Sequence, residues 1–155
     1  MTLTAAAERT IHAPAADLFT YVADFVDHHP RFLPPAFSDF TVEAGGVGVG
    51  TVTSSNLRIG GRTQRLRTRV TRAEPGRLVE EIVLGRPMTT TFSFAPTGDG
   101  TLARIETAWT PSGGLAGLLE KLFAPRAVSK VYADELDRLA AYAASRATAA
   151  GGAAA

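Results

Sequence analysis

The stretch from Asp24 to Phe37, DFVDHHPRFLPPAF, holds the densest group of side chains that could bind a metal or transfer protons in this chain of 155 residues. It contains two of the three histidines, with Asp24 and Asp27 beside them. Imidazole and carboxylate groups are good ligands for zinc or iron. Adjacent histidines in an extended turn point to opposite sides, however, and two rings on one helix need a spacing of four residues to meet. We therefore expect neither a metal site nor a cofactor here.

A structural role for this stretch is the simpler interpretation. We expect Asp24 and Asp27 to cap or end short helices, with His28 and His29 at the surface. The alternative is that His28 or His29 acts as a polar or acid–base group at the mouth of a pocket. The apolar side chains that would close one end of such a pocket are Phe32, Leu33 and Phe37.

Glu80 is the second candidate for chemistry. Alternation of apolar residues in the segment 78–84 predicts that Glu80 faces inward and that Glu81 faces solvent. Burial raises the pKa of a carboxyl group, which can then serve as a general acid or base or bind a ligand hydroxyl. The alternatives are a salt bridge from Glu80 to Arg62 or Arg126, or a bulge that reverses the alternation.

Six arginines fall between residues 58 and 72, which raises the question of nucleic-acid binding. Three of them share one face of the expected strand 62–72, with no aromatic residue interleaved for base stacking. The formal charge of the whole chain is only +1. We therefore expect a solvated sheet face and no nucleic-acid partner, while Arg62 and Arg86, near strand ends, could reach the rim of a pocket.

The length and composition of the chain limit the classes of protein to which it can belong. A chain of this length with 45% hydrophobic residues can bury one substantial core, so we expect one domain over residues 1–146. The absence of cysteine excludes disulfides, thiolate ligands and a cysteine nucleophile. No secretory signal and no apolar run of about 20 residues is present, so we expect a cytoplasmic protein without an integral membrane segment. The Ala/Gly-rich tail at 147–155 is expected to be disordered.

Periodicity predicts the order of the elements. A strand over 3–11 is followed by a helix that begins at Pro14 and ends before Pro30. Glycine-rich or proline-rich turns then separate six strands, which we expect near 40–44, 51–59, 62–72, 78–84, 89–95 and 101–110. A long helix covers about 115–142, and Pro125 should kink it or end its first half. Such a helix can be buried in the concave side of a curled antiparallel sheet.

This order resembles the START-like (SRPBCC, helix-grip) superfamily, in particular its polyketide cyclase/dehydrase-like branch. The local patterns that carry the resemblance are IHAPAADLFTYVADF, HHPRFLP, GVGVGT, RVTRAEPGRLVEE, FAPTGDGT and YADELDRLAAY. The resemblance implies an α+β helix-grip fold. In this fold a curved antiparallel sheet of about seven strands wraps around a long C-terminal helix, and two short helices lie between the first and second strands.

The resemblance also implies a mostly apolar cavity between sheet and long helix. The expected function is binding of a hydrophobic or aromatic small molecule, such as a lipid, a polyketide-like compound or an isoprenoid. The alternative is a cyclase/dehydratase-like lyase or isomerase, with Glu80, His28 and Arg62 as candidate catalytic residues. A protein-binding role would need an exposed apolar patch. Nothing in the sequence sets the oligomeric state.

Alternation and helical spacing predict which side chains line that cavity. The expected ligand-binding residues are Phe32, Leu33, Phe37, Leu57, Gln64, Leu66, Thr68, Glu80, Ile82, Thr90, Phe92, Phe94, Ile105, Trp109, Leu118, Leu122 and Tyr132.

Overall fold

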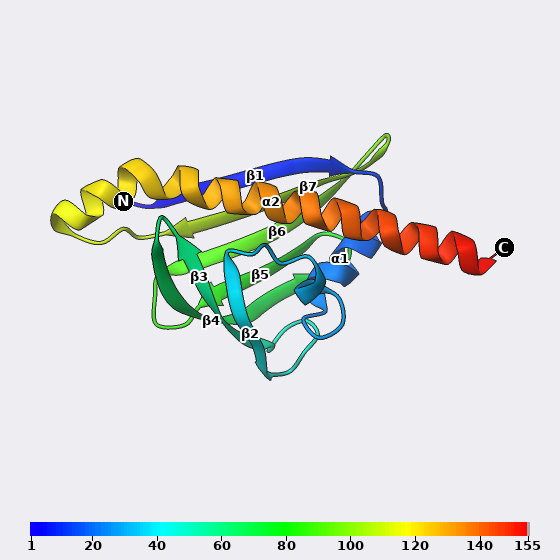
Figure 1. Ribbon diagram of the computed structural model, residues 1–155, viewed down its shortest axis with the longest axis horizontal. Coiled ribbons are helices and arrows are strands. Elements are labelled where there is room, and N and C mark those ends of the chain that lie inside the picture. Colours follow the sequence, from blue (N-terminus) through cyan, green and yellow to red (C-terminus); the bar gives the residue numbers. More distant parts are fainter. Residues whose placement is uncertain (155) are drawn as a thin grey trace.

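The structure is a computed structural model that describes residues 1–154, except for the side chains of residues 119, 123 and 152–154. The elements are β1 (Leu3–Ile11), α1 (Ala15–Ala23), the 3-10 helix η1 (His29–Arg31), β2 (Phe37–Ala44), β3 (Val52–Ile59), β4 (Arg62–Glu74), β5 (Leu78–Val83), β6 (Met88–Thr97), β7 (Gly100–Trp109) and α2 (Gly114–Ala154). The seven strands form one antiparallel sheet in the order β1-β7-β6-β5-β4-β3-β2. The predicted helix-grip architecture is confirmed (Figure 1).

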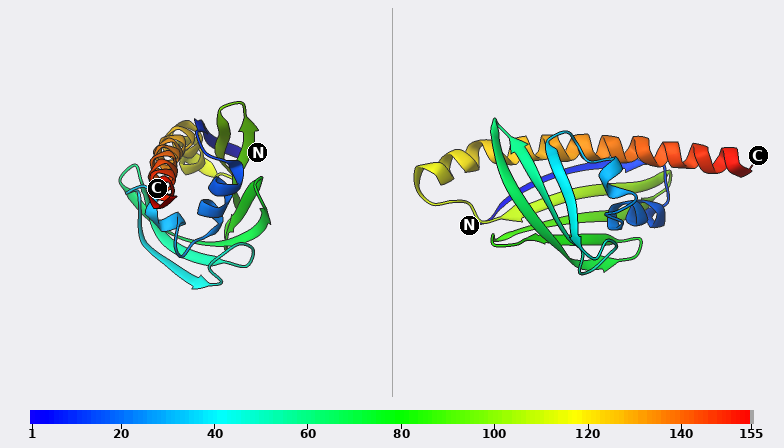
Figure 2. Two further views of the ribbon diagram at one scale, coloured as in Figure 1. Left: turned by 90° about the vertical axis from the view of Figure 1, so that its right-hand side faces the viewer. Right: turned by 60° about the horizontal axis from the view of Figure 1, so that its bottom comes forward.

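Local irregularities shape the sheet. Gly60 and Gly61 have φ angles of 59° and 78°, the positive values that a tight type I′ hairpin between β3 and β4 requires. Bulges interrupt the pairing of β2 with β3 and of β4 with β5. A bulge bends its strand and increases the local twist. Figure 2 shows the consequence, since the sheet curves around the side on which α2 and α1 lie.

The stretch after α1 is built as a compact turn. The Oδ1 atom of Asp24 accepts hydrogen bonds from the backbone N–H groups of Val26 (3.0 Å) and Asp27 (2.8 Å). The Phe25 N–H donates to the carbonyl oxygen of Gly46 (2.8 Å), which ties this turn to the glycine-rich loop between β2 and β3. The prediction that Asp24 ends the first helix and that the glycine-rich stretch is a turn is confirmed.

The middle of α2 anchors the helix to the sheet. Tyr132, Leu136, Leu139 and Ala143 recur at spacings of four and three residues and are buried in the main core. Outside this apolar face, Arg9 on β1 forms an ion pair of 2.6 Å with Asp137. Figure 1 shows α2 running along β1 and β7. The core therefore fixes the middle of the helix, and the part before it can bridge a gap.

Pro125 lies inside α2, and the first turns of the helix run at an angle to the remainder in Figure 1, in agreement with the expected alternative of a kink. The helix extends from Gly114 to Ala154. The high helix propensity of alanine favours the helical form of its last turns. No helix in the described part of the chain is long and apolar enough to cross a membrane.

The anchoring of α2 gives a test of stability. Replacing Leu136, which is 1% exposed, by alanine should lower the free energy of unfolding by about 2–5 kcal/mol, because buried contacts are lost and a cavity remains. Leu118→Ala on the same helix is the matched control, since Leu118 is 52% exposed and should lose less than about 0.5 kcal/mol. Urea denaturation followed by circular dichroism measures both. Equal losses would contradict this account of α2.

Candidate functional site

A cavity of about 1090 Å³ lies between the concave face of the sheet and α2. Side chains from β3 to β7 form its floor, and one face of α2 forms its roof. That face carries the small residues Ala116, Ala124, Ala127 and Val128, together with the longer Glu120, Tyr132 and Glu135. The small side chains at these described positions leave room for the hollow between helix and sheet.

The structure brings many of the predicted site residues to this cavity. Those that line it are Leu33, Phe37, Leu57, Arg62, Gln64, Leu66, Thr68, Thr90, Phe92, Trp109 and Tyr132. The inward faces predicted for β4, β6 and β7 are confirmed, because the buried residues Leu66 and Val70, Phe92 and Phe94, and those of β7 are spaced two or four residues apart.

Other predicted residues lie elsewhere. Phe32, Phe94 and Ile105 are buried in the core against α1 and α2 and do not line the cavity. Leu118 and Leu122 lie on the exposed side of α2, together with Leu115. The expectation that these two leucines face the cavity is wrong, because helical spacing identifies an apolar stripe but not the direction in which it points.

The predicted orientation of β5 is also wrong. Val79 and Val83 are buried on the concave side, and Glu81 shares their face and lines the cavity. Glu80 and Ile82 therefore lie on the outer face. The segment LVEEIV carries apolar residues on both faces, so its alternation fits either orientation.

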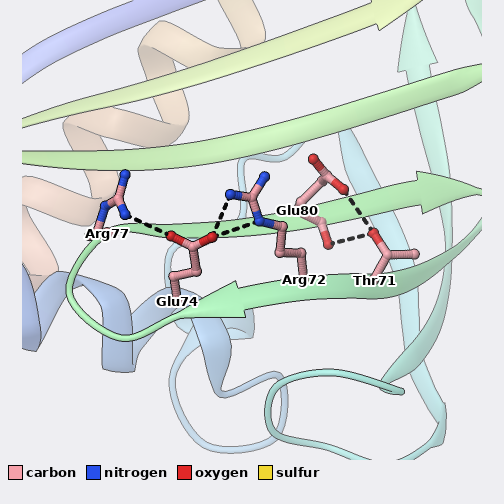
Figure 3. Close-up of polar contacts among 5 residues, drawn as sticks. All are labelled: Thr71, Arg72, Glu74, Arg77 and Glu80. Atoms are coloured by element: carbon pink, nitrogen blue, oxygen red, sulfur yellow. Dashed lines mark hydrogen bonds and ion pairs between the residues drawn. The ribbon is translucent and has the colours of Figure 1, made fainter.

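Glu80 belongs to a polar group on the outer face of β4 and β5 (Figure 3). Thr71 donates a hydrogen bond to the Oε1 atom of Glu80 (3.1 Å). Next to it, Glu74 accepts a hydrogen bond from the Nε atom of Arg72 (2.7 Å) and forms an ion pair with Arg77 (3.1 Å). Such exposed pairs contribute little stability and stand outside the cavity.

The two adjacent histidines point to different places, as expected, but His29 is not at the surface. The Nδ1 atom of His28 lies 2.6 Å from the hydroxyl oxygen of Tyr142, and His28 does not line the cavity. His29 is only 3% exposed, and its ring stacks between Phe25 and Phe32. The reason is that η1 turns the chain back toward the core, so the second histidine of the pair is carried inward.

His29 and Glu135 form a buried pair at the cavity wall. The Nδ1 atom of His29 lies 2.7 Å from the carbonyl oxygen of Val22, and its Nε2 atom lies 3.4 Å from Oε1 of Glu135. Both ring nitrogens thus face acceptors, which favours the imidazolium form. Burial alone lowers the pKa of His29, but the hydrogen bond and negative charge of Glu135 raise it above its ordinary value.

Glu81 completes a group that we call the acid–base cluster: His29, Glu81 and Glu135. All three line the cavity. Burial raises the pKa of Glu81, although the charge of His29 and a hydrogen bond from Thr68 oppose this rise. The cluster therefore places two carboxyl groups and one imidazole around an apolar hollow. Within the part of the chain that the structure describes, no group of three such side chains is arranged to hold a metal ion.

Hydroxyl groups form two short chains along the cavity floor. The Oγ1 atoms of Thr53 and Thr68 are 2.8 Å apart, and those of Thr90 and Thr107 are 2.7 Å apart. Thr107 is also hydrogen-bonded to the hydroxyl group of Tyr132 on α2. Burial raises the pKa of Tyr132 to about 12, so its hydroxyl group stays neutral and available for hydrogen bonding.

The opposite end of the cavity is more exposed and carries charged groups. Arg62 and Arg86 line it, and the Nη1 atom of Arg86 donates a hydrogen bond to Oε1 of Gln64 (2.5 Å). Glu120 on α2 accepts hydrogen bonds from the indole N–H of Trp109 (2.7 Å) and the backbone N–H of Ser112 (3.0 Å). We call this region the arginine end.

Sequence reasoning missed Glu135, Glu81 and the alanines of α2. A signal for Glu135 was present, because it stands three residues after Tyr132 on an otherwise apolar helical face. A carboxylate in such a face needs a partner, and His29 provides it. The remaining arginines of β4 point outward as predicted, and Arg67 pairs with Glu43 at 2.5 Å.

Comparisons with known proteins agree with this geometry. The solution structure of KanY superposes with a TM-score of 0.81 at 26% identity, covering 92% of this chain and 98% of that one. The Zhui aromatase/cyclase from Streptomyces sp. R1128 gives a TM-score of 0.80 at 17% identity, covering 97% and 99%. The di-domain aromatase/cyclase StfQ of the steffimycin biosynthetic pathway gives 0.74 at 17% identity, covering 96% of this chain and 52% of that one.

A search of curated protein sequences gave no match. The profile of the family described as "Polyketide cyclase / dehydrase and lipid transport" matches residues 2–144. The match spans every strand and most of α2, so the predicted resemblance is confirmed. The chain belongs to the polyketide cyclase/dehydrase and lipid transport family.

Proposed function

We propose that this protein encloses a hydrophobic or aromatic small molecule in the cavity between the sheet and α2. The observation that carries the proposal is the cavity itself, whose volume of about 1090 Å³ is slightly above the usual range for small-molecule sites. Its walls combine aliphatic and aromatic side chains with a few convergent polar groups. Burial of apolar surface would supply the affinity, and the polar groups would select the orientation.

The class of ligand follows from the lining and is supported by the family. Phe25, Phe92 and Trp109 offer aromatic surface, and the family description names both polyketide chemistry and lipid transport. A lipid, a polyketide-like molecule or an isoprenoid fits an apolar hollow of this size. A cytoplasmic location and a role as a small-molecule carrier belong to the same proposal.

Blocking the cavity tests ligand binding. In Ala127→Phe a ring would project from α2 into the hollow, so the affinity for the uncharged dye N-phenylnaphthylamine should fall about tenfold or more, as expected for an occluded apolar site. Ala133→Phe is the matched control, because Ala133 lies on the exposed side of the same helix. Fluorescence titration measures both affinities, and thermal unfolding checks that each variant folds.

Either of two results would contradict the proposal. One is that the wild-type protein does not bind the dye; the other is that the dye binds Ala127→Phe as tightly as it binds the wild type. In a positive result, saturating dye should also raise the melting temperature of the wild type, since a ligand at about 100 times its Kd adds about 2.7 kcal/mol to stability.

A second candidate function is catalysis of the cyclase/dehydratase type, favoured by the His29–Glu135 pair. His29 is buried at the cavity wall, carries a raised pKa and is oriented by an acceptor at each ring nitrogen. The pair would act together as a general acid: both ring N–H groups of His29 donate to protein acceptors, so the proton would reach the substrate through the Glu135 carboxyl group, which lines the cavity. The proton would go to the hydroxyl oxygen of a β-hydroxy ketone, the α-carbon would give its proton to water, and cleavage of the C–O bond would release water and form an enone.

Turnover of a phenyl-substituted β-hydroxy ketone tests this second function through the absorbance of the conjugated enone. Glu135→Gln removes the charge that raises the pKa of His29, so the rate should fall about a hundredfold or more. In the wild type the rate should fall as the pH rises through the raised pKa of His29, because the acid form is lost above it. Glu80→Gln on the outer face is the control. If the protein binds the dye but releases no water from the β-hydroxy ketone, the proposed catalysis is contradicted and the proposed ligand binding is not.

A further inference from the structure

The acid–base cluster contains two carboxyl groups, those of Glu81 and Glu135, but only one basic group, the imidazole of His29. His29 pairs with Glu135 at 3.4 Å, and Glu135 is only 2% exposed. One imidazolium and one carboxylate balance each other. A second carboxylate at Glu81 would add an unpaired negative charge to a low-dielectric hollow, which is costly. The composition of the cluster therefore favours the neutral carboxylic acid at Glu81.

The hydrogen-bond partners around Glu81 allow its acid proton to face the cavity. A neutral carboxyl group has one O–H donor and one carbonyl acceptor. The hydroxyl group of Thr68 bonds to the Glu81 carboxyl group and is itself 2.8 Å from the hydroxyl group of Thr53. This chain of hydroxyls can satisfy the acceptor of Glu81 from the floor. Among the polar groups that face Glu81, Glu135 is already paired with His29 and Tyr132 is already hydrogen-bonded to Thr107. The apolar residues Val83 and Phe92 line the rest of this region, so a ligand acceptor there would meet the O–H of Glu81.

We propose that Glu81 anchors the enclosed ligand by donating a hydrogen bond from its carboxylic acid to a carbonyl oxygen at the inner end of the cavity. This inference rests on the proposed function and specifies the chemistry of its ligand. The ligand carries a neutral acceptor such as a ketone at its leading end. An anionic group at that end would be unfavourable because it would meet Glu135, and His29 is already paired with Glu135.

The two ends of the cavity then set the direction of the ligand. The acid–base cluster accepts the carbonyl end, and Arg62 and Arg86 line the opposite, exposed end. A molecule with an apolar aromatic body and a polar or anionic tail would therefore enter with its ketone foremost. The cavity distinguishes such a molecule from a fatty acid, whose carboxylate belongs at the arginine end.

The anchor has a definite pH dependence. The titratable groups that face Glu81 are His29 on η1 and Tyr132 and Glu135 on α2. Tyr132 stays neutral up to a pKa of about 12. As the pH rises through the raised pKa of Glu81, the donor is lost and the carboxylate repels the carbonyl oxygen. Preference for a ketone should therefore be strongest at low pH.

Two dyes with one body test the proposal. Prodan is a dimethylaminonaphthalene that carries a propionyl ketone, and dimethylaminonaphthalene lacks that ketone. The ratio of their Kd values, from fluorescence titration between about pH 5 and about pH 9, measures the ketone preference. We expect the wild type to show a preference of about tenfold at low pH that declines as the pH rises.

Substitutions at Glu81 and its outward neighbour separate the explanations. Glu81→Gln keeps a donor that does not titrate, so the preference should persist and lose its pH dependence. Glu81→Val should lose the preference, so that the ratio of the two Kd values approaches one. Glu80→Gln and Glu80→Val are matched controls and should behave as the wild type does, because Glu80 lies on the outer face.

Each outcome of the dye titrations supports or contradicts the anchor or the proposed function. Undiminished preference in Glu81→Val, with both dyes bound, would overturn the anchor and leave the proposed function standing. Binding of neither dye to the wild type would overturn the proposed function and the anchor with it. If Glu81→Val does not fold, a pH dependence that is unchanged in Glu81→Gln would overturn the anchor.

Discussion

The attachment of α2 to the sheet through only part of its length is the constraint on which the site depends. Leu136 and Leu139 hold the middle of the helix in the core, next to β1 and β7. Toward its N-terminal end the helix presents alanines to a sheet that curves away from it. The core packs at normal density where α2 is anchored, and small residues face the sheet where it is not. This arrangement leaves a hollow while the fold is kept.

The polar groups in the hollow follow from the same arrangement. The long helix α2 brings Tyr132 and Glu135 over the concave side of the sheet. There Tyr132 is hydrogen-bonded to Thr107, and Glu135 pairs with His29. Buried polar groups are stable only when they are hydrogen-bonded or paired. The pairing of Glu135 with His29 therefore ties α2 to η1 and fixes an ionic group beside an apolar cavity.

The fold could be predicted from the sequence because its signals are local and redundant. Hairpin glycines such as Gly60, the alternation in β4, β6 and β7 and the prolines after α1 each specify an element independently. The site could be predicted only in part. In β5, apolar residues on both faces made Glu80 and Glu81 indistinguishable, and the depth of His29 depends on the turn of η1, which has no periodic signal.

The central claim is that an apolar molecule lies inside the hollow and not on the exposed leucines of α2. Nuclear Overhauser effects between bound N-phenylnaphthylamine and assigned protein protons test it most directly. The account predicts contacts from the dye to the Ala127 methyl group and the Phe92 ring, which line the cavity. Contacts confined to Leu115, Leu118 and Leu122, on the exposed side of α2, would contradict it.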